Sequence, residues 1–214
     1  MIYNIIGKIY GISKRVFLKI HRQITGMYTI FLLKINGVDL GKNIRSNGVP
    51  IIDFGWSKTK VVIGDNFKMN NGIRYNIIGR QAPCCLVVRN AAHISDFAEL
   101  TIGHNVGMSS STIVCHKKIT IGNNVKIGGN CVIYDTDFHS LDAGIRRVAL
   151  EDQRNYGCKD VHIGNDVFIG AHSTILKGVS IGDNSIIGAC SVVTKSVPAN
   201  QIWAGNPAKL VRNI

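Results

Sequence analysis

Acidic residues are scarce in this sequence. Of 214 residues, 13 are Asp or Glu and 25 are Lys or Arg, which gives a formal net charge of +12 at pH 7. Proline occurs only 4 times, which excludes a collagen-like chain, and a hydrophobic fraction of 45% excludes a disordered one. A basic surface of this kind suits anionic partners: nucleic acid, anionic lipid or a small polyphosphate ligand.

Long hydrophobic runs and paired cysteine motifs are also missing. No stretch approaches the ~18 consecutive apolar residues of a membrane-spanning helix, and the N-terminus lacks the apolar core and cleavage site of a secretion signal. The 6 cysteines form no C-x-x-C motif, which favours reduced thiols over a disulfide framework. We therefore expect a cytoplasmic protein.

The sequence repeats with a period of six residues. Isoleucine or valine leads each hexad, often followed by glycine; the leads are Ile163, Ile169, Ile175, Ile181, Ile187 and Val193. A second run reads Ile102, Met108 and Val114, then slips by one residue at Cys115–Lys118 and continues with Ile121, Ile127 and Ile133. This period does not fit a helix, whose repeat is 3.6 residues. It predicts short strands joined by tight corners.

Three hexads make one triangular coil, and a coil cannot bury its apolar face without neighbours. The lead residues should point inward, with a small or β-branched residue four positions later: Val167, Ser173, Val179, Ser185, Ser191 and Val197. The pattern predicts an all-β solenoid over residues 46–198, with the slip as a bulged corner. Residues 199–214 form a tail.

Residues 1–45 are predicted to form a helical arm before the solenoid. Over residues 1–26, isoleucines and Val16 fall on one side of a helix, and Lys8, Lys14, Arg15, Lys19 and Arg22 fall on the other. Two uses remain open and can coexist: a cap on the open end of the solenoid, or contact with an anionic membrane. Residues 27–60 are expected to hold a second short helix or strand and the first, irregular coil.

The sequence also contains a long loop that interrupts the repeat, called the excursion below, and three further motifs. Residues 139–161 break the period, and so long a loop in a solenoid is more often functional than decorative. The motifs are YDTDFHSLD (134–142), IGAHSTILKGVSIGDNSIIGACSVVTKSVP (169–198) and AGNPAKLVR (204–212). Together with the hexads, the chain resembles the hexapeptide-repeat acyltransferases, whose fold is a left-handed parallel β-helix. Within that family it resembles the galactoside and maltose O-acetyltransferases, and more closely those of exopolysaccharide, capsule and lipopolysaccharide synthesis.

The resemblance implies a catalytic histidine and a coenzyme site. His139 matches the family's general base, which takes the proton from an acceptor hydroxyl; imidazole, with an unperturbed pKa of about 6.5, suits that role. The co-substrate is acetyl-CoA, and transfer is direct, without an acyl-enzyme. The positions matching coenzyme contacts are Ala171, Ala189, Thr194, Lys195, Lys209 and Arg212. The amide of Ala171 is also a candidate oxyanion donor.

The acceptor side is less defined. Ser110, Asn130 and Tyr134 are candidate acceptor contacts, together with Asp137 and Asp142. The group that orients the ring of His139 is left open between Asp137, Asp142 and a backbone carbonyl. The maltose and galactoside enzymes have proline directly after the catalytic histidine.

This chain instead has Ser140, which argues against a free disaccharide acceptor. The family's zinc-dependent carbonic anhydrase branch needs three converging histidines, two of them close together in the sequence, and His139 has no histidine five residues further on. Gly144 stands there, so no metal is expected.

The leading hypothesis is an acetyl-CoA-dependent sugar O-acetyltransferase of surface polysaccharide synthesis, working as a homotrimer with each site between two subunits. The arm leaves contact with the inner face of the membrane open. Alternatives are an N-acyltransferase on a nucleotide-linked amino sugar, transfer to a xenobiotic, and a non-catalytic structural solenoid. No G-x-G-x-x-G follows a strand to favour the first of these. Nucleic-acid binding is not expected, because the charge comes without an aromatic platform.

Overall fold

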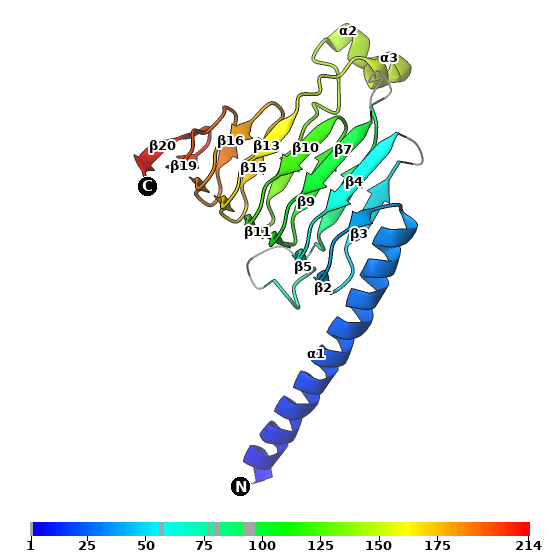
Figure 1. The fold of residues 1–214 in the computed structure, drawn as a ribbon, viewed down its shortest axis with the longest axis vertical. Coiled ribbons are helices and arrows are strands. Elements are labelled where there is room, and N and C mark those ends of the chain that lie inside the picture. The colour runs from blue at the N-terminus through cyan, green and yellow to red at the C-terminus, as the bar shows by residue number, and fades with distance from the viewer. Residues whose placement is uncertain (1, 56–57, 77, 79–81, 92–96) are drawn as a thin grey trace.

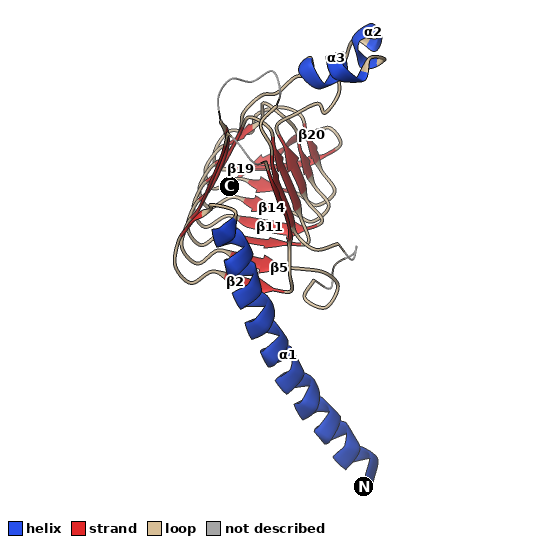
Figure 2. Ribbon diagram, turned by 90° about the vertical axis from the view of Figure 1, so that its right-hand side faces the viewer, coloured by secondary structure: helices blue, strands red, loops and turns tan. Residues whose placement is uncertain are grey.

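The chain folds as a triangular solenoid with a long helix at its N-terminal end (Figure 1). The computed structural model describes residues 2–55, 58–76, 78, 82–91 and 97–214, with side chains from residue 6 onward. Strands stack into three sheets that form the three walls (Figure 2). All pairs between successive coils are parallel, so the predicted left-handed parallel β-helix is confirmed.

Each wall takes one strand from every coil. Sheet A is ordered β1 (Asp39–Leu40), β4 (Thr59–Ile63), β7 (Ala98–Ile102), β10 (Lys118–Ile121), β13 (Val161–Ile163) and β16 (Ser180–Ile181). Sheet B is ordered β2 (Arg45–Asn47), β5 (Lys68–Asn70), β8 (Gly107–Ser109), β11 (Lys126–Gly129), β14 (Phe168–Ile169), β17 (Ile186–Ile187), β19 (Gln201–Gly205) and β20 (Ala208–Asn213). Sheet C is ordered β3 (Ile51–Phe54), β6 (Cys85–Val88), β9 (Thr112–Cys115), β12 (Val132–Tyr134), β15 (Thr174–Ile175) and β18 (Val192–Val193).

The core lies inside the triangle and follows the predicted hexads. The lead residues from Ile163 to Val193 are fully buried, and so are the small residues four positions later. One assignment was wrong: Val114 is half-buried and Ile113 points inward instead. The cause is the corner after β8, which is one residue shorter than the corner after β11, as the register shift at Gly129 and Ser109 records.

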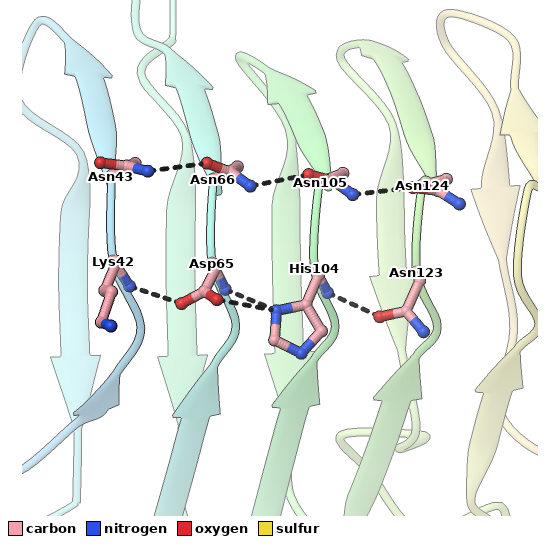
Figure 3. A network of polar contacts seen from close by, with 8 residues as sticks. All are labelled: Lys42, Asn43, Asp65, Asn66, His104, Asn105, Asn123 and Asn124. Carbon is pink, nitrogen blue, oxygen red and sulfur yellow. Dashed lines mark hydrogen bonds and ion pairs between the residues drawn. The ribbon is translucent and has the colours of Figure 1, made fainter.

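Side-chain ladders join the coils at the corner between sheets A and B (Figure 3). Asn66 donates to Asn105, and Asn105 donates to Asn124, at 2.9 and 3.0 Å. These asparagines have φ near +60°, a backbone conformation that asparagine tolerates better than most residues. Glycine precedes this corner because a Cβ on Gly103 would lie 2.7 Å from the backbone of Gly122. The repeated Gly-x-Asn therefore allows the corners of successive coils to approach closely and bond to one another.

The predicted bulged corner at Cys115–Lys118 is held by one buried carboxylate. Asp135 is fully buried, and it accepts the backbone N–H groups of His116, Lys117 and Lys118 at 2.7, 2.8 and 2.7 Å. Asp135 lies one coil further along, just after β12. The side chain thus replaces the ladder hydrogen bonds that the bulge interrupts.

Replacing Asp135 with alanine is expected to destabilise the fold by about 3–5 kcal/mol, because three backbone donors lose their acceptor inside the structure. Urea unfolding followed by circular dichroism measures this loss. Asp53→Ala is the matched control, since Asp53 pairs with Arg89 at the surface and such pairs contribute about 0–1 kcal/mol. Equal midpoints for the two variants would contradict this role of Asp135.

Helix α1 (Ile2–Ile35) is longer than the amphipathic stretch seen in the sequence. Residues 27–35 extend the same helix, so the short element expected next is strand β1 rather than a second helix. Only the last turns cover the open end of the solenoid, where Thr29 and Leu33 are buried. The rest of α1 projects away from it (Figures 1 and 2). Within the described residues, no helix has the length and apolarity needed to cross a membrane.

The six cysteines are all free thiols, as the sequence predicts. Cys84, Cys115 and Cys131 are buried, whereas Cys190 is exposed. Burial raises the pKa of the Cys84 thiol to about 11. These buried thiols are packing residues rather than nucleophiles.

Candidate active site

The excursion between β12 and β13 carries two short helices, α2 (Ala143–Arg146) and α3 (Ala149–Arg154). Aromatic contacts fix its base to the solenoid. The Tyr156 hydroxyl lies 3.0 Å from Nδ1 of His116, and the rings of His116 and Phe138 meet edge to face at 5.8 Å. Burial raises the pKa of Tyr156 to about 12, with the charges of Cys158 and Asp135 adding to it. Both ends of the excursion are therefore held against the solenoid by contacts with His116.

His139 stands at the start of this excursion and is paired with a carboxylate. Its Nδ1 lies 2.6 Å from Oδ2 of Asp152 on α3. An ionised carboxylate only accepts hydrogen bonds, so Nδ1 carries the proton and Nε2 of the neutral ring keeps its lone pair. The His139 side chain is 68% exposed, whereas that of Asp152 is 11% exposed. His139 is thus an accessible base, and the largely buried carboxylate of Asp152 holds its ring in place.

Asp152 is itself held by the backbone. Its Oδ1 accepts the N–H of Ser140 at 2.6 Å, and Nη1 of Arg146 donates to the Ser140 carbonyl at 2.6 Å. The hydrogen bond from His139, and then that from Ser140, hold the pKa of Asp152 below its ordinary value. Proline at position 140 would have no N–H to donate. The arrangement therefore needs a residue other than proline at position 140, where the sequence has Ser140.

A hollow of about 410 Å³ opens between the excursion and sheet C. Tyr134, Asp137, Lys177 and Thr194 are among the residues that line it. Asp137 pairs with Lys177 at 3.3 Å. Burial and the charge of Asp137 raise the pKa of Tyr134. Three predicted site residues, Tyr134, Asp137 and Thr194, are thus brought together on this wall.

The predicted basic tail residues gather in part at the last coil. Thr194, Lys195, Lys209 and Trp203 line a hollow of about 240 Å³ formed with the β19–β20 hairpin. The residues lining it include no acid. Arg212 is not among those lining residues, and it lies exposed further along β20.

Another group of predicted residues lies at the corner between sheets B and C. Ala171 and Ala189 follow β14 and β17 there, and a Cβ on Gly170 would lie 2.5 Å from the Ala189 nitrogen. In the described part of the chain, the N–H groups of Ala171 and Ala189 donate no hydrogen bond. Ser110 and Asn130 share this corner, but Ser110 is only 3% exposed.

The structure thus brings the predicted residues together in two groups. The first group, at the corner where sheet C ends, is Tyr134, Asp137, Thr194, Lys195 and Lys209. The second, at the corner where sheet C begins, is Ser110, Asn130, Ala171 and Ala189. His139 stands in the excursion and is not among the residues lining either hollow. Asp142 belongs to neither group as a contact, since its Oδ1 accepts the Ile145 N–H and caps α2.

Asp152 is the residue that sequence reasoning missed. Its only signal was an acidic residue inside the excursion. Metal-binding clusters of three or more His, Cys, Asp or Glu do not occur among the described residues.

Comparison with family models gives two matches. Residues 160–195 match the bacterial transferase hexapeptide (six repeats), and residues 118–135 match the hexapeptide repeat of succinyl-transferase.

Several curated proteins are similar to the chain. It is 31% identical to 2,3,4,5-tetrahydropyridine-2,6-dicarboxylate N-acetyltransferase of Halalkalibacterium halodurans, over 84% of the chain and 79% of that protein. It is 46% identical to protein CapG of Staphylococcus aureus over 45% of the chain and 53% of CapG. With galactoside O-acetyltransferase of Escherichia coli it shares 38% identity over 59% of the chain and 60% of that enzyme. The chain thus spans little more than half the length of the latter two relatives.

Solved structures share the fold. AntD, an N-acyltransferase from Bacillus cereus in complex with dTDP and 3-hydroxybutyryl-CoA, superimposes with a TM-score of 0.63 at 21% identity, over 87% of this chain and 88% of AntD. The hexapeptide-repeat acetyltransferase VCA0836 from Vibrio cholerae, complexed with acetyl coenzyme A, gives 0.52 at 23% identity, over 86% of this chain and 75% of that chain. At these identities the likeness concerns the fold.

Proposed function

The chain belongs to the hexapeptide-repeat transferases and is an acyltransferase, and from this premise we propose that it moves an acetyl group from acetyl-CoA to a hydroxyl group of a saccharide. The proposal rests on the hydrogen bond between His139 and Asp152. With the proton on Nδ1, the Nε2 atom of His139 is unprotonated and accessible at the start of the excursion. A hydroxyl needs such a base as it attacks a thioester.

The residues support a direct transfer. Nε2 of His139 takes the proton from the acceptor hydroxyl while its oxygen forms a bond to the thioester carbonyl carbon. When the carbon–sulfur bond breaks, the imidazolium returns the proton to the departing thiolate, so the enzyme ends as it began. Asp152 stabilises the imidazolium in between. No nucleophilic side chain is needed, and the protein mainly positions the two substrates.

The donor site we propose uses both groups of residues. The free N–H groups of Ala171 and Ala189 suit the amide carbonyls of a pantetheine arm, and the Ala171 N–H suits a developing oxyanion. Lys195 and Lys209, in a hollow without acids, suit the coenzyme phosphates. CoA is bound in the AntD and VCA0836 structures, which supports acetyl-CoA as co-substrate here.

We propose that a homotrimer completes each site. Ala171 and His139 lie at opposite edges of sheet C, so a pantetheine arm held at Ala171 of one copy can meet His139 of a neighbour if two subunits pack along that wall. His139 of one copy then faces a pantetheine arm held by its neighbour.

The double variant Lys195→Gln/Lys209→Gln is expected to weaken acetyl-CoA binding at least about tenfold, because two charge-assisted contacts are lost. Calorimetry measures the dissociation constant, and KM for acetyl-CoA should rise with it while kcat changes little. Lys42→Gln/Lys126→Gln is the matched control with the same charge change. Equal weakening in both variants would mean that net charge alone attracts the coenzyme.

Relatives act on both oxygen and nitrogen, as the names galactoside O-acetyltransferase and AntD N-acyltransferase state. We favour a hydroxyl of a surface polysaccharide precursor because of the motif YDTDFHSLD around His139 and the similarity to CapG. An amino sugar on a nucleotide remains the second candidate, since AntD is complexed with dTDP.

Product mass spectrometry separates these candidates. The protein is incubated with acetyl-CoA and a panel of free sugars, amino sugars, nucleotide sugars and lipid-linked glycans. The proposal predicts one added acetyl group that mild alkali removes, because an ester hydrolyses where an amide survives. An alkali-stable product formed only on amines would replace O-transfer with N-transfer.

A further inference from the structure

Helix α1 packs on the solenoid with the side that carries its basic residues, whereas a simple cap would use the apolar side. Thr29 and Leu33 are buried there, and Thr25 and Gly26 are half-buried against β2. Thr25 Oγ1 accepts the Gly48 N–H at 3.1 Å. These residues lie on the side that also carries the basic residues. The apolar side of the helix, for which a cap and membrane contact were both left open, points the other way.

The uncovered side is a continuous apolar stripe along the helix. Its members recur every three or four residues and are Ile6, Ile9, Ile12, Val16, Ile20, Ile24, Met27, Phe31 and Ile35. Their exposures lie between 50% for Ile20 and 73% for Met27. At 1.5 Å per residue the stripe is about 44 Å long. An exposed apolar surface of this length marks an interaction site.

The charges of α1 all have one sign. Its charged residues are Lys8, Lys14, Arg15, Lys19, Arg22 and Lys34, and it contains no Asp or Glu. A second α1 helix packed along the stripe would offer no acidic residue to pair with these cations. An anionic bilayer takes both features at once, since acyl chains cover the stripe and headgroups meet the cations.

A basic hollow adjoins the stripe where α1 meets the solenoid. It measures about 440 Å³ and is lined by Arg22, Arg45 and Lys68, together with Met27 of the stripe. The residues lining it include no acid. The guanidinium of Arg22 sits over the Tyr75 ring at 5.5 Å, and His21 Nδ1 lies 2.6 Å from the Tyr75 hydroxyl. These contacts hold the helix at a fixed angle to the hollow.

We propose that α1 lies in the headgroup region of an anionic membrane, with the apolar stripe toward the acyl chains and a lipid phosphate held by Arg22, Arg45 and Lys68. The surface is independent of the transfer reaction, so either proposal can fail alone. Membrane docking places the solenoid beside lipid-borne molecules.

Flotation with vesicles tests this proposal. The full chain is mixed with vesicles of phosphatidylcholine alone or with about one third phosphatidylglycerol, at ~0.1 M salt. We expect binding to the anionic vesicles and at least about tenfold less to the neutral ones. The variant Val16→Ser/Ile20→Ser/Ile24→Ser keeps all charges and should lose binding at least about tenfold. Arg22→Gln/Arg45→Gln/Lys68→Gln should lose it by a similar factor.

The matched control changes apolar residues that are equally exposed elsewhere. Ile51 and Phe97 are 52% and 60% exposed, and Ile51→Ser/Phe97→Ser should float like the wild type. Circular dichroism verifies that each variant keeps its helix content. Undiminished flotation of the stripe variant, or no flotation of the wild type, overturns the proposal. Absent flotation with an oligomer that falls apart in the stripe variant would assign the stripe to a second copy instead.

Discussion

Replacing His139 with alanine is expected to lower kcat by about 10³-fold, within the usual range for loss of a general base. The variant keeps the positioning of both substrates, so the dissociation constant for acetyl-CoA should stay within about twofold of the wild type. The fold should persist as well, because the His139 side chain is largely exposed and contributes little burial. Initial rates with the acceptor found by product analysis measure the effect.

His104→Ala is the matched control for this substitution. His104 belongs to the corner between sheets A and B, where its Nδ1 accepts the Asp65 N–H at 3.0 Å (Figure 3). The control should retain wild-type kcat. Equal activity of His139→Ala and the wild type would remove His139 from the mechanism.

The variant Asp152→Asn is expected to lower kcat about 10- to 100-fold while KM changes little. The asparagine amide can present N–H to Nδ1, which favours the ring tautomer with the proton on Nε2 and so blocks the base. Asp152 is a positioning residue, since it touches His139 rather than substrate. Asp152→Glu should restore part of the rate, because it returns the carboxylate.

The pH profile separates this positioning role from a merely structural one. Removing a negative charge beside an imidazole makes its protonated form less favourable, so the acid limb of kcat should move to lower pH in Asp152→Asn. Glu151→Gln, on the same short helix and exposed, should leave rate and profile unchanged. A reduced rate with an unmoved acid limb would point to a loosened excursion instead.

The ionised carboxylate of Asp152, bonded to His139, also contributes to the stability of the folded chain. The pKa of Asp152 is lowered in the folded chain, so its contribution is fully present above the ordinary pKa of an aspartate. It is lost as the pH falls through the lowered folded value. The carboxylate therefore stays ionised throughout the neutral range in which the enzyme would be assayed.

The solenoid was predictable because its physics is local and repeated. A lead residue every six positions can only be buried if each hexad forms one wall, so Ile163 and its successors defined the walls without any knowledge of distant contacts. The error at Val114 arose where the corner after β8 is a residue shorter and the bulge at Cys115–Lys118 compensates. The bulge is held by Asp135 from the next coil. A six-residue repeat does not show that a residue so far along the chain is its partner.

The site was predictable only where it follows a motif. The string around His139 identified the candidate base, whereas Asp152 lies 13 residues further along the chain, in a segment without periodicity. Its place depends on how α3 folds back over Ser140, which is a matter of tertiary packing. The side of α1 that packs on the solenoid could not be predicted for a similar reason. An amphipathic pattern shows which residues avoid water in the end, but not whether protein or lipid covers them.

The most direct test of the mechanism is a single turnover with isotopically labelled acetyl-CoA, in which the masses of enzyme and acceptor are followed together. Direct transfer predicts that the label passes from coenzyme to an acceptor hydroxyl with the enzyme mass unchanged throughout, and that His139→Ala slows this step about 10³-fold. A labelled enzyme that forms and decays at the rate of product formation, or transfer at the wild-type rate in His139→Ala, would contradict it.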